Sequence, residues 1–185
     1  FMNVVKSGVI LKSDLLTLKE LELTDVTRKY IDWLNDSEIN KYLETRFQYQ
    51  DKYKVKEFVE KCRSSELDFL FGIFLSNTME HIGNIKVGSI NLHHCHAEIG
   101  LMIGDKRCWG RGYASNAISM VTEFCFENLR LSKISAGCYK SNVGSKKAFE
   151  KSGYKIEGIL RAHVKLSNRR DDVYRLGCTK SDFIS

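Results

Sequence analysis

Residues 107–114 read Arg-Cys-Trp-Gly-Arg-Gly-Tyr-Ala and follow a predicted strand that ends at Ile103. A predicted helix begins at Ala114, so these residues form a glycine-bearing loop between a strand and a helix. Such a loop presents backbone N–H groups at the positive end of a helix dipole, where proteins commonly hold phosphates. Gly110 and Gly112 allow the main chain to approach an anion closely. Because a tight turn without a ligand uses glycine in the same way, the surrounding sequence has to discriminate between the two interpretations.

Two common nucleotide-binding loops do not fit this segment. A dinucleotide-binding Rossmann loop needs a third glycine at position 115, where the chain has Ser115. It also needs an acidic residue at the end of the next strand, where Tyr139 and Lys140 stand. A P-loop ends in Gly-Lys-Ser or Gly-Lys-Thr, and this loop has neither. We therefore expect neither NAD nor ATP to bind by those routes.

Apolar periodicity predicts the elements on both sides of the loop. Strands are expected over residues 14–23, 69–75, 81–92, 97–103, 133–139, 154–160 and 172–178, and helices over residues 26–35, 51–62, 114–129 and 142–151. The three strands between residues 69 and 103 are separated only by turn residues, which is typical of antiparallel neighbours. The order β-α-α-β-β-β-α-β-α-β-β therefore indicates a mixed α/β domain.

The composition is that of an ordinary globular protein with a modest positive charge. The chain has 185 residues, 43% hydrophobic and 28% charged, with a formal net charge of +6, and it corresponds to one domain, 1–185. No apolar run approaches the roughly 20 residues that a membrane helix needs. The basic residues do not concentrate in one tract with interleaved aromatics, and the N-terminal residues lack the pattern of a secretory signal. We expect a cytoplasmic protein that binds neither membrane nor nucleic acid.

The cysteines and histidines do not indicate a metal. The six cysteines are scattered without a C-x-x-C pair: Cys62, Cys95, Cys108, Cys125, Cys138 and Cys178. Reduced thiols in a cytosol are the simplest interpretation. His93, His94 and His96 surround Cys95 at a predicted hairpin tip, which favours a solvated turn over a metal site. No metal site is predicted.

Three motifs together resemble one family. The segment Arg107–Ala114 resembles the Q/R-x-x-G-x-G/A pyrophosphate signature of the GNAT acyltransferase superfamily. The segments Ala97-Glu98-Ile99-Gly100 and 142–154 (NVGSKKAFEKSGY) are similar to its ribosomal-protein alanine acetyltransferase branch. The resemblance implies the GNAT fold, a mostly antiparallel, splayed mixed sheet of about seven strands flanked by about four helices. It also implies a bacterial, cytoplasmic N-acetyltransferase that transfers acetyl directly from acetyl-CoA to a primary amine.

The same resemblance implies where acetyl-CoA binds. The strands 97–103 and 133–139 would splay apart, and the pantetheine arm would lie in the resulting cleft. The implied cofactor-binding residues are Leu101, Met102 and Ile103 along the arm, Arg107, Cys108, Trp109, Gly110, Arg111, Gly112, Tyr113 and Ala114 in the diphosphate loop, and Asn142, Ser145 and Lys147 in the next helix.

Acetyl transfer needs a base for the amine and a proton donor for the leaving thiolate. Amines with a pKa near ~10 are mostly protonated at neutral pH. Glu98 is the candidate base because its strand enters the cleft; pairing with a basic neighbour is the alternative. Many GNAT enzymes place a tyrosine acid where this chain has Phe149, which leaves Ser145 or a water as the donor, with Tyr139 and Tyr154 as substitutes.

The acceptor side is less defined by sequence. Trp33, Tyr42, Arg46 and Phe47 are expected to shape the acceptor pocket, although core packing explains Trp33 and Phe47 equally well. The acceptor is a small-molecule amine or a peptide: a nucleotide-linked amino sugar, a protein N-terminus or a polyamine. A basic run, Arg161, His163, Lys165, Arg169 and Arg170, is either a solvated hairpin or a contact for a phosphate. A non-catalytic acyl-CoA-binding module is the alternative function, and a homodimer is one assembly that the sequence allows.

Overall fold

The computed structural model describes residues 8–184, which contain one eight-stranded sheet. The strands are β1 (Ile10–Lys12), β2 (Leu16–Glu20), β3 (Phe69–Leu75), β4 (His81–Asn91), β5 (His96–Ile103), β6 (Lys133–Tyr139), β7 (Lys155–Leu166) and β8 (Arg169–Thr179). Their order across the sheet is β1-β2-β3-β4-β5-β6-β8-β7. All neighbouring pairs are antiparallel except β5 and β6, which are parallel. The expected mixed, mostly antiparallel sheet is confirmed.

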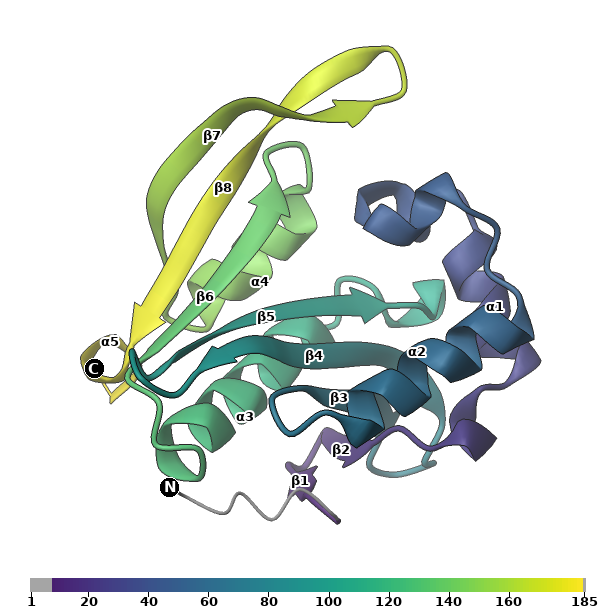
Figure 1. The fold of residues 1–185 in the computed structure, drawn as a ribbon, viewed down its shortest axis with the longest axis horizontal. Helices are drawn as coiled ribbons and strands as arrows, with labels where there is room; N and C mark the ends of the chain where they lie inside the picture. The colour runs from purple at the N-terminus through teal and green to yellow at the C-terminus, as the bar shows by residue number, and fades with distance from the viewer. Residues whose placement is uncertain (1–7, 185) are drawn as a thin grey trace.

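The helices lie on both faces of this sheet (Figure 1). The α-helices are α1 (Arg28–Asn35), α2 (Lys52–Ser64), α3 (Tyr113–Glu127), α4 (Val143–Lys151) and α5 (Lys180–Ile184), and short 3-10 turns are η1 (Leu23–Asp25), η2 (Asn40–Tyr42), η3 (Glu44–Phe47) and η4 (Lys106–Cys108). Alternate residues of β3 show the two layers. Phe69 and Phe71 pack against Phe124 of α3, whereas Leu70 points into a second core cluster formed by α1 and α2.

Side-chain caps fix where the helices begin. Asp51 Oδ1 accepts from the Lys54 N–H at the start of α2, and Asn142 Oδ1 accepts from the Ser145 N–H at the start of α4. Both helices were predicted to begin at these residues. The cap of α1 is Thr27, whose hydroxyl accepts from the Tyr30 N–H. Thr24 and Asp25, just before it, lie in the 3-10 turn η1.

The structure adds two short elements to the predicted set. Strand β1 has three residues and helix α5 has five, too few to show a periodic pattern in the sequence. The sheet therefore has eight strands rather than about seven. The hairpin of β7 and β8 is also longer than predicted, and it projects beyond the rest of the sheet (Figure 1).

The sheet splits between strands β5 and β6. Strands β5 and β6 pair only from His96–Lys133 to Glu98–Ser135, although both strands continue well past these residues. Beyond Glu98, β5 stays with β4 and β6 stays with β8, so the two halves of the sheet diverge (Figure 1). This divergence confirms the predicted splay. No helix within residues 8–184 is long and apolar enough to cross a membrane.

Candidate active site

The glycine loop, residues 105–115, connects β5 to α3. Gly110 and Gly112 adopt left-handed backbone conformations, with φ of 72° and 81°. A Cβ at Gly110 would have no neighbour within 4 Å, and one at Gly112 would only touch the Ser115 hydroxyl at 4.0 Å. The two glycines are therefore required by backbone conformation rather than by lack of space. Gly112 is also the N-cap residue of α3, where the helix dipole is positive.

The loop exposes a row of backbone donors. Among the described residues, no acceptor is found for the N–H groups of residues 110–115. By contrast, Arg107, Cys108 and Trp109 donate their N–H groups to Asp105 Oδ1, Asp105 O and Lys106 O. Unpaired N–H groups at a helix N-terminus next to two left-handed glycines form an anion-binding concavity. The amides from Gly110 to Ser115 therefore fit a diphosphate.

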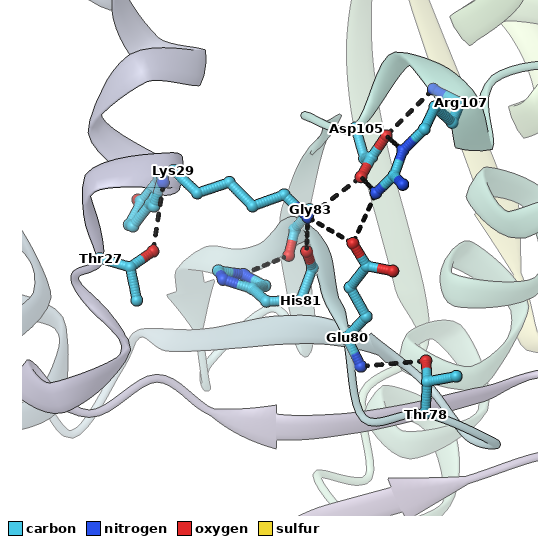
Figure 2. Close-up of polar contacts among 9 residues, drawn as sticks. Thr27, Lys29, Thr78, Glu80, His81, Gly83, Asp105 and Arg107 are labelled. Carbon is cyan, nitrogen blue, oxygen red and sulfur yellow. Dashed lines mark hydrogen bonds and ion pairs between the residues drawn. The ribbon is translucent and has the colours of Figure 1, made fainter.

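A charged network holds the start of this loop (Figure 2). Asp105 is buried, with 6% exposure, and its carboxylate accepts four donors. Oδ1 accepts from the Arg107 N–H and Nε, both at 3.0 Å, and Oδ2 accepts from Arg107 Nη2 at 2.6 Å and from Lys29 Nζ at 3.0 Å. Glu80 contacts Lys29 Nζ at 2.8 Å and Arg107 Nη2 at 2.6 Å. The network thus ties the loop to α1 and to the first residues of β4.

The network lowers the pKa of both carboxyls. The hydrogen bond from Arg107 is the largest effect at Asp105, and the hydrogen bond from Lys29 is the largest at Glu80. Both groups are therefore anionic throughout the neutral range. No sequence pattern pointed to this network, because Lys29 and Glu80 are far from Asp105 in the chain.

Two of the predicted cofactor residues have structural partners in this arrangement. The Arg107 amide and two of its guanidinium nitrogens are bound to Asp105 and Glu80, so Arg107 supports the loop. Cys108 is buried in the main core with its amide bonded to Asp105 O, and burial raises the pKa of its thiol. The side chain of Arg111, in contrast, is exposed at the loop surface.

The main chain of β5 presents alternate residues to the split. The Gly104 N–H donates to Ile82 O on β4. Because the main-chain N–H and C=O groups of successive strand residues point to opposite sides, those of Met102 also face β4, whereas those of Leu101 and Ile103 face away from it. Trp109 Nε1 donates to Ile103 O at 2.8 Å, which confirms that this carbonyl points away from β4. The main-chain groups of Leu101 and the Ile103 N–H thus face the split. The main-chain groups of Met102 face β4, and its side chain packs into the second core.

A cavity of about 560 Å³, which we call the splay cavity, lies where β5 and β6 separate. It is lined by Tyr42, Glu44, Arg46, Phe47, Glu98, Gly137, Tyr139, His163, Val164, Lys165 and Val173. The segment 42–47 closes one side and the β7–β8 hairpin closes another. Arg46 connects them, since its Nη1 donates to the Tyr139 hydroxyl at 3.0 Å and its Nη2 donates to Lys165 O at 3.1 Å. Tyr42, Arg46 and Phe47 therefore lie at the predicted pocket.

Glu98 lies in this cavity as an ion-paired carboxylate. Arg175 of β8 donates from Nη1 to Oε1 at 2.9 Å and from Nη2 to Oε2 at 3.3 Å. Both side chains are about two-fifths exposed, so the pair faces solvent in the cavity rather than the core. Gly137 of β6 leaves room for it, because a Cβ there would lie 3.2 Å from Arg175 Nη1 and 3.8 Å from Glu98 Oε1. No sequence pattern indicated that Arg175 pairs with Glu98.

Helix α4 places Asn142 and Ser145 at the β6 side of the split. The Asn142 amide oxygen caps α4, so its Nδ2 is the group that can donate outward. Ser145 is half-buried, and its hydroxyl has no hydrogen-bond partner among the described residues. Phe149 is 1% exposed and packs edge-on against Tyr154.

Two tyrosines were considered as substitutes for the usual acid. Tyr154 is 2% exposed and shares a hydrogen bond with Thr122, and burial raises its pKa, so it is removed from any reaction. The Tyr139 hydroxyl lines the splay cavity, donates to Glu44 Oε1 at 2.5 Å, and has a raised pKa because it is partly buried and bonded to Glu44. Tyr139 thus helps to build the cavity wall.

Trp33 does not belong to the cavity. It is 6% exposed in the second core and packs against the rings of Tyr30 and His81. A Cβ on Gly104 would lie 2.1 Å from the Trp33 ring, so the two residues touch closely at the root of the glycine loop. The core interpretation of Trp33 is therefore correct, and its assignment to the acceptor pocket was wrong.

A splayed sheet with unpaired helix-terminal amides on one side of the split and a polar cavity on the other defines a CoA-dependent acyltransferase. The acetyltransferase (GNAT) domain family matches residues 16–155, and the chain belongs to this family. It is an N-acetyltransferase that uses acetyl-CoA.

Relatives and solved structures agree with this assignment. The chain is 28% identical over 176 residues to the uncharacterized N-acetyltransferase p20 of Bacillus licheniformis, covering 94% of this chain and 97% of p20. It is 32% identical over 120 residues to the probable N-acetyltransferase YjcK of Bacillus subtilis, covering 64% and 65% of the two chains. The fold matches spermidine N-acetyltransferase from Vibrio cholerae in complex with CoA and spermine, with a TM-score of 0.83, 24% identity, and 94% and 100% of the two chains covered.

Proposed function

We propose that this N-acetyltransferase acetylates a primary amine that enters the splay cavity, with Glu98 as the base and Ser145 as the proton donor. The observation that carries the proposal is the position of the cavity. It opens where β5 and β6 part, and the free amides of the glycine loop lie past the end of the same strand β5. An amine in the cavity is therefore placed to meet the thioester of an acetyl-CoA whose diphosphate lies on the loop.

The free amides from Gly110 to Ser115 support binding of the CoA diphosphate. Leu101 and the Ile103 N–H supply main-chain groups for the pantetheine arm, and the Asn142 Nδ2 is available to its thioester end. Lys147 and Arg111 are exposed cations suited to the remaining phosphate. Bound acetyl-CoA supplies the activated acetyl group; the chain has to orient it and to move two protons.

Glu98 is proposed to take the proton of the acceptor ammonium. Its two oxygens each accept one hydrogen bond from Arg175, and a carboxylate oxygen has a further lone pair for an ammonium or a water. Ser145 is proposed to return a proton to the leaving sulfur, because its hydroxyl lies one helical turn after Asn142 and is uncommitted. Phe149 has no proton to donate and Tyr154 is buried, so neither side chain fills this role.

The acceptor belongs to one of three classes: a nucleotide-linked amino sugar, a protein N-terminal amine or a polyamine. The segments 33–36 and 42–47 loosely resemble chains that act on surface-sugar precursors, which favours the first class. Similarity to the ribosomal-protein branch would favour the second, and the Vibrio cholerae enzyme acts on spermidine, an example of the third. We further propose that the protein works in the cytoplasm as a single domain, either alone or as a homodimer.

Thiol release tests the reaction. Acetyl-CoA mixed with a panel of amino sugars, peptides and polyamines should give free thiol with at least one amine. Acetyl-CoA at 100 times its dissociation constant should also raise Tm by roughly 5 to 10 °C, because binding only the folded state contributes about 2.7 kcal/mol. A shift in Tm without thiol release from any amine would favour a non-catalytic acyl-CoA-binding module instead.

A further inference from the structure

Both carboxylates that line the splay cavity already have cationic or hydrogen-bonding partners. Glu98 is bound by two nitrogens of Arg175. Glu44 accepts from the Tyr139 hydroxyl and lies 3.7 Å from Arg46 Nη1. A polyamine presents two or more ammonium groups. Glu98 keeps a lone pair for one of them, as proposed above, but the cavity wall in the described residues offers no unpartnered carboxylate for a second, so its charge does not favour a polycation.

The cations around the cavity are arranged differently. Lys165 lines it, and the adjoining part of the β7–β8 hairpin carries Arg161 and Arg169. Within residues 8–184, no carboxylate lies within 4 Å of the charged groups of Lys165, Arg161 or Arg169. These side chains therefore form a basic rim, residues 161–170 of the hairpin, at one side of the cavity.

The two carboxylates of the hairpin offset only part of this charge, since Asp171 interacts with Arg169 and Asp172 interacts with Arg161. Asp171 Oδ2 accepts from the Ser141 N–H at 3.0 Å and from the Ser141 hydroxyl at 2.6 Å. Asp172 binds Lys140 Nζ at 3.0 Å and the Ala162 N–H at 2.9 Å. Both are thus occupied in joining the hairpin to the loop before α4. Residues 161–172 hold four Lys or Arg and two Asp, so this end of the hairpin keeps an excess of positive charge.

We infer, building on the N-acetyltransferase function proposed above, that the acceptor is a small-molecule amine that also carries a phosphate, which the basic rim binds. Arginine and lysine are the side chains that bind phosphate most strongly, because they offer charged donors that match its oxygens. The volume of about 560 Å³ is in the range of small-ligand pockets. The amine lies in the cavity near Glu98, and the phosphate lies outside it against Lys165 and Arg161.

Pairs of amines that differ only in a phosphate test this inference. Glucosamine is compared with glucosamine 6-phosphate, and ethanolamine with phosphoethanolamine, by thiol release at saturating acetyl-CoA. A nucleotide-linked amino sugar distinguishes a diphosphate from a monophosphate, and spermidine represents the polyamines. In every pair that turns over, we expect the phosphorylated amine to have at least a tenfold higher kcat/KM, through a lower KM, and spermidine to be slower. Raising the salt concentration should reduce this advantage.

Two charge reversals connect the effect to the rim. Lys165→Glu should abolish the advantage of the phosphorylated amine through KM, while the affinity for acetyl-CoA stays unchanged. Lys12→Glu makes the same charge change on the exposed edge strand β1, at the opposite edge of the sheet, and should preserve the advantage. Equal use of both members of a pair, a preference for spermidine, or an unaltered ratio in Lys165→Glu would overturn the inference.

The inference and the proposed function fail in different ways. If no amine releases thiol although acetyl-CoA raises Tm, the proposed function fails. Binding of glucosamine 6-phosphate and glucosamine to the CoA-saturated protein, measured by calorimetry, then still tests the rim. Tighter binding of the phosphorylated amine that is lost in Lys165→Glu would support the rim, and equal or absent binding of both would overturn it.

Discussion

The glycine loop and the splay cavity are built in opposite ways. The loop is local: Asp105 holds Arg107 two residues away, and Gly112 caps the helix that follows it. The cavity is assembled from distant segments, since Arg46 bonds Lys165 across 119 residues and Tyr139 bonds Glu44 across 95. The comparison shows that the proposed diphosphate site lies within one short segment. The proposed acceptor cavity depends instead on how three separate parts of the chain meet.

Gly112→Glu should have the largest effect, because it damages the local side of this comparison at one position. The left-handed φ of 81° strains any side chain, and the added carboxylate repels a diphosphate. We expect acetyl-CoA binding, measured by calorimetry, to be abolished. Gly158→Glu adds the same group at a glycine without positive φ and with open space around it, so that variant should bind normally. Full affinity in Gly112→Glu would remove the loop from the cofactor site.

Glu98→Gln tests the cavity side. If Glu98 takes the ammonium proton, kcat should fall by roughly 100-fold or more, as loss of a general base commonly causes, while acetyl-CoA affinity stays near that of the parent. The exposed Glu57→Gln on α2 is the matched control and should retain full activity. A Glu98→Gln variant as fast as the parent at neutral pH would assign the proton transfer to water, and Glu98 would then serve only to hold Arg175.

Ser145→Ala separates chemistry from folding at the start of α4. The helix cap is Asn142, which uses the Ser145 amide and not its hydroxyl, so alanine keeps the cap. We expect about a tenfold lower kcat, equivalent to 1.4 kcal/mol, with an unchanged Tm. Asn142→Ala removes the cap itself and should lower the stability by about 1 kcal/mol. If Ser145→Ala lowers Tm and leaves kcat intact, the hydroxyl has a structural role only.

Asp105→Asn should have the smallest effect on the cofactor and tests how the local region is supported. Loss of the charge weakens the contacts with Arg107 and Lys29, so acetyl-CoA affinity should fall by roughly threefold to fivefold, under 1 kcal/mol. Because Lys29 and Arg107 are substantially exposed, we expect about 1 to 2 kcal/mol of lost stability at pH 7.

The pH dependence of that variant has a definite sign. The folded-state pKa of Asp105 is lowered, so its contribution to stability is full above the unfolded-state pKa near ~4 and is lost as the pH falls toward the folded-state value. The difference in Tm between parent and Asp105→Asn should therefore be constant from pH 5 to pH 8 and should narrow below about pH 4. A difference that widens in acid would contradict the assigned role.

Sequence patterns predicted most of the fold because the relevant signals are local. The continuous apolar run Phe69–Leu75 indicates a strand that is buried on both faces, and the helical spacing after Ala114 indicates which side of the helix is buried. The same patterns missed β1 and α5, which are too short to repeat. They also could not separate a buried tryptophan from a pocket tryptophan, and only the contact between Trp33 and Gly104 decided that question.

By itself, the sequence determined the order of the elements, the left-handed glycines at Gly110 and Gly112, and hence the family and its cofactor. These features depend on residues within a few positions of one another, where backbone conformation is set by sterics and short-range hydrogen bonds. Only the tertiary structure decided that Arg107 is bound to Glu80, that Glu98 is paired with Arg175, and that Arg46 closes the cavity. Such pairs join segments far apart in the chain, and an ion pair leaves no trace in either segment until the sheet brings its two members together.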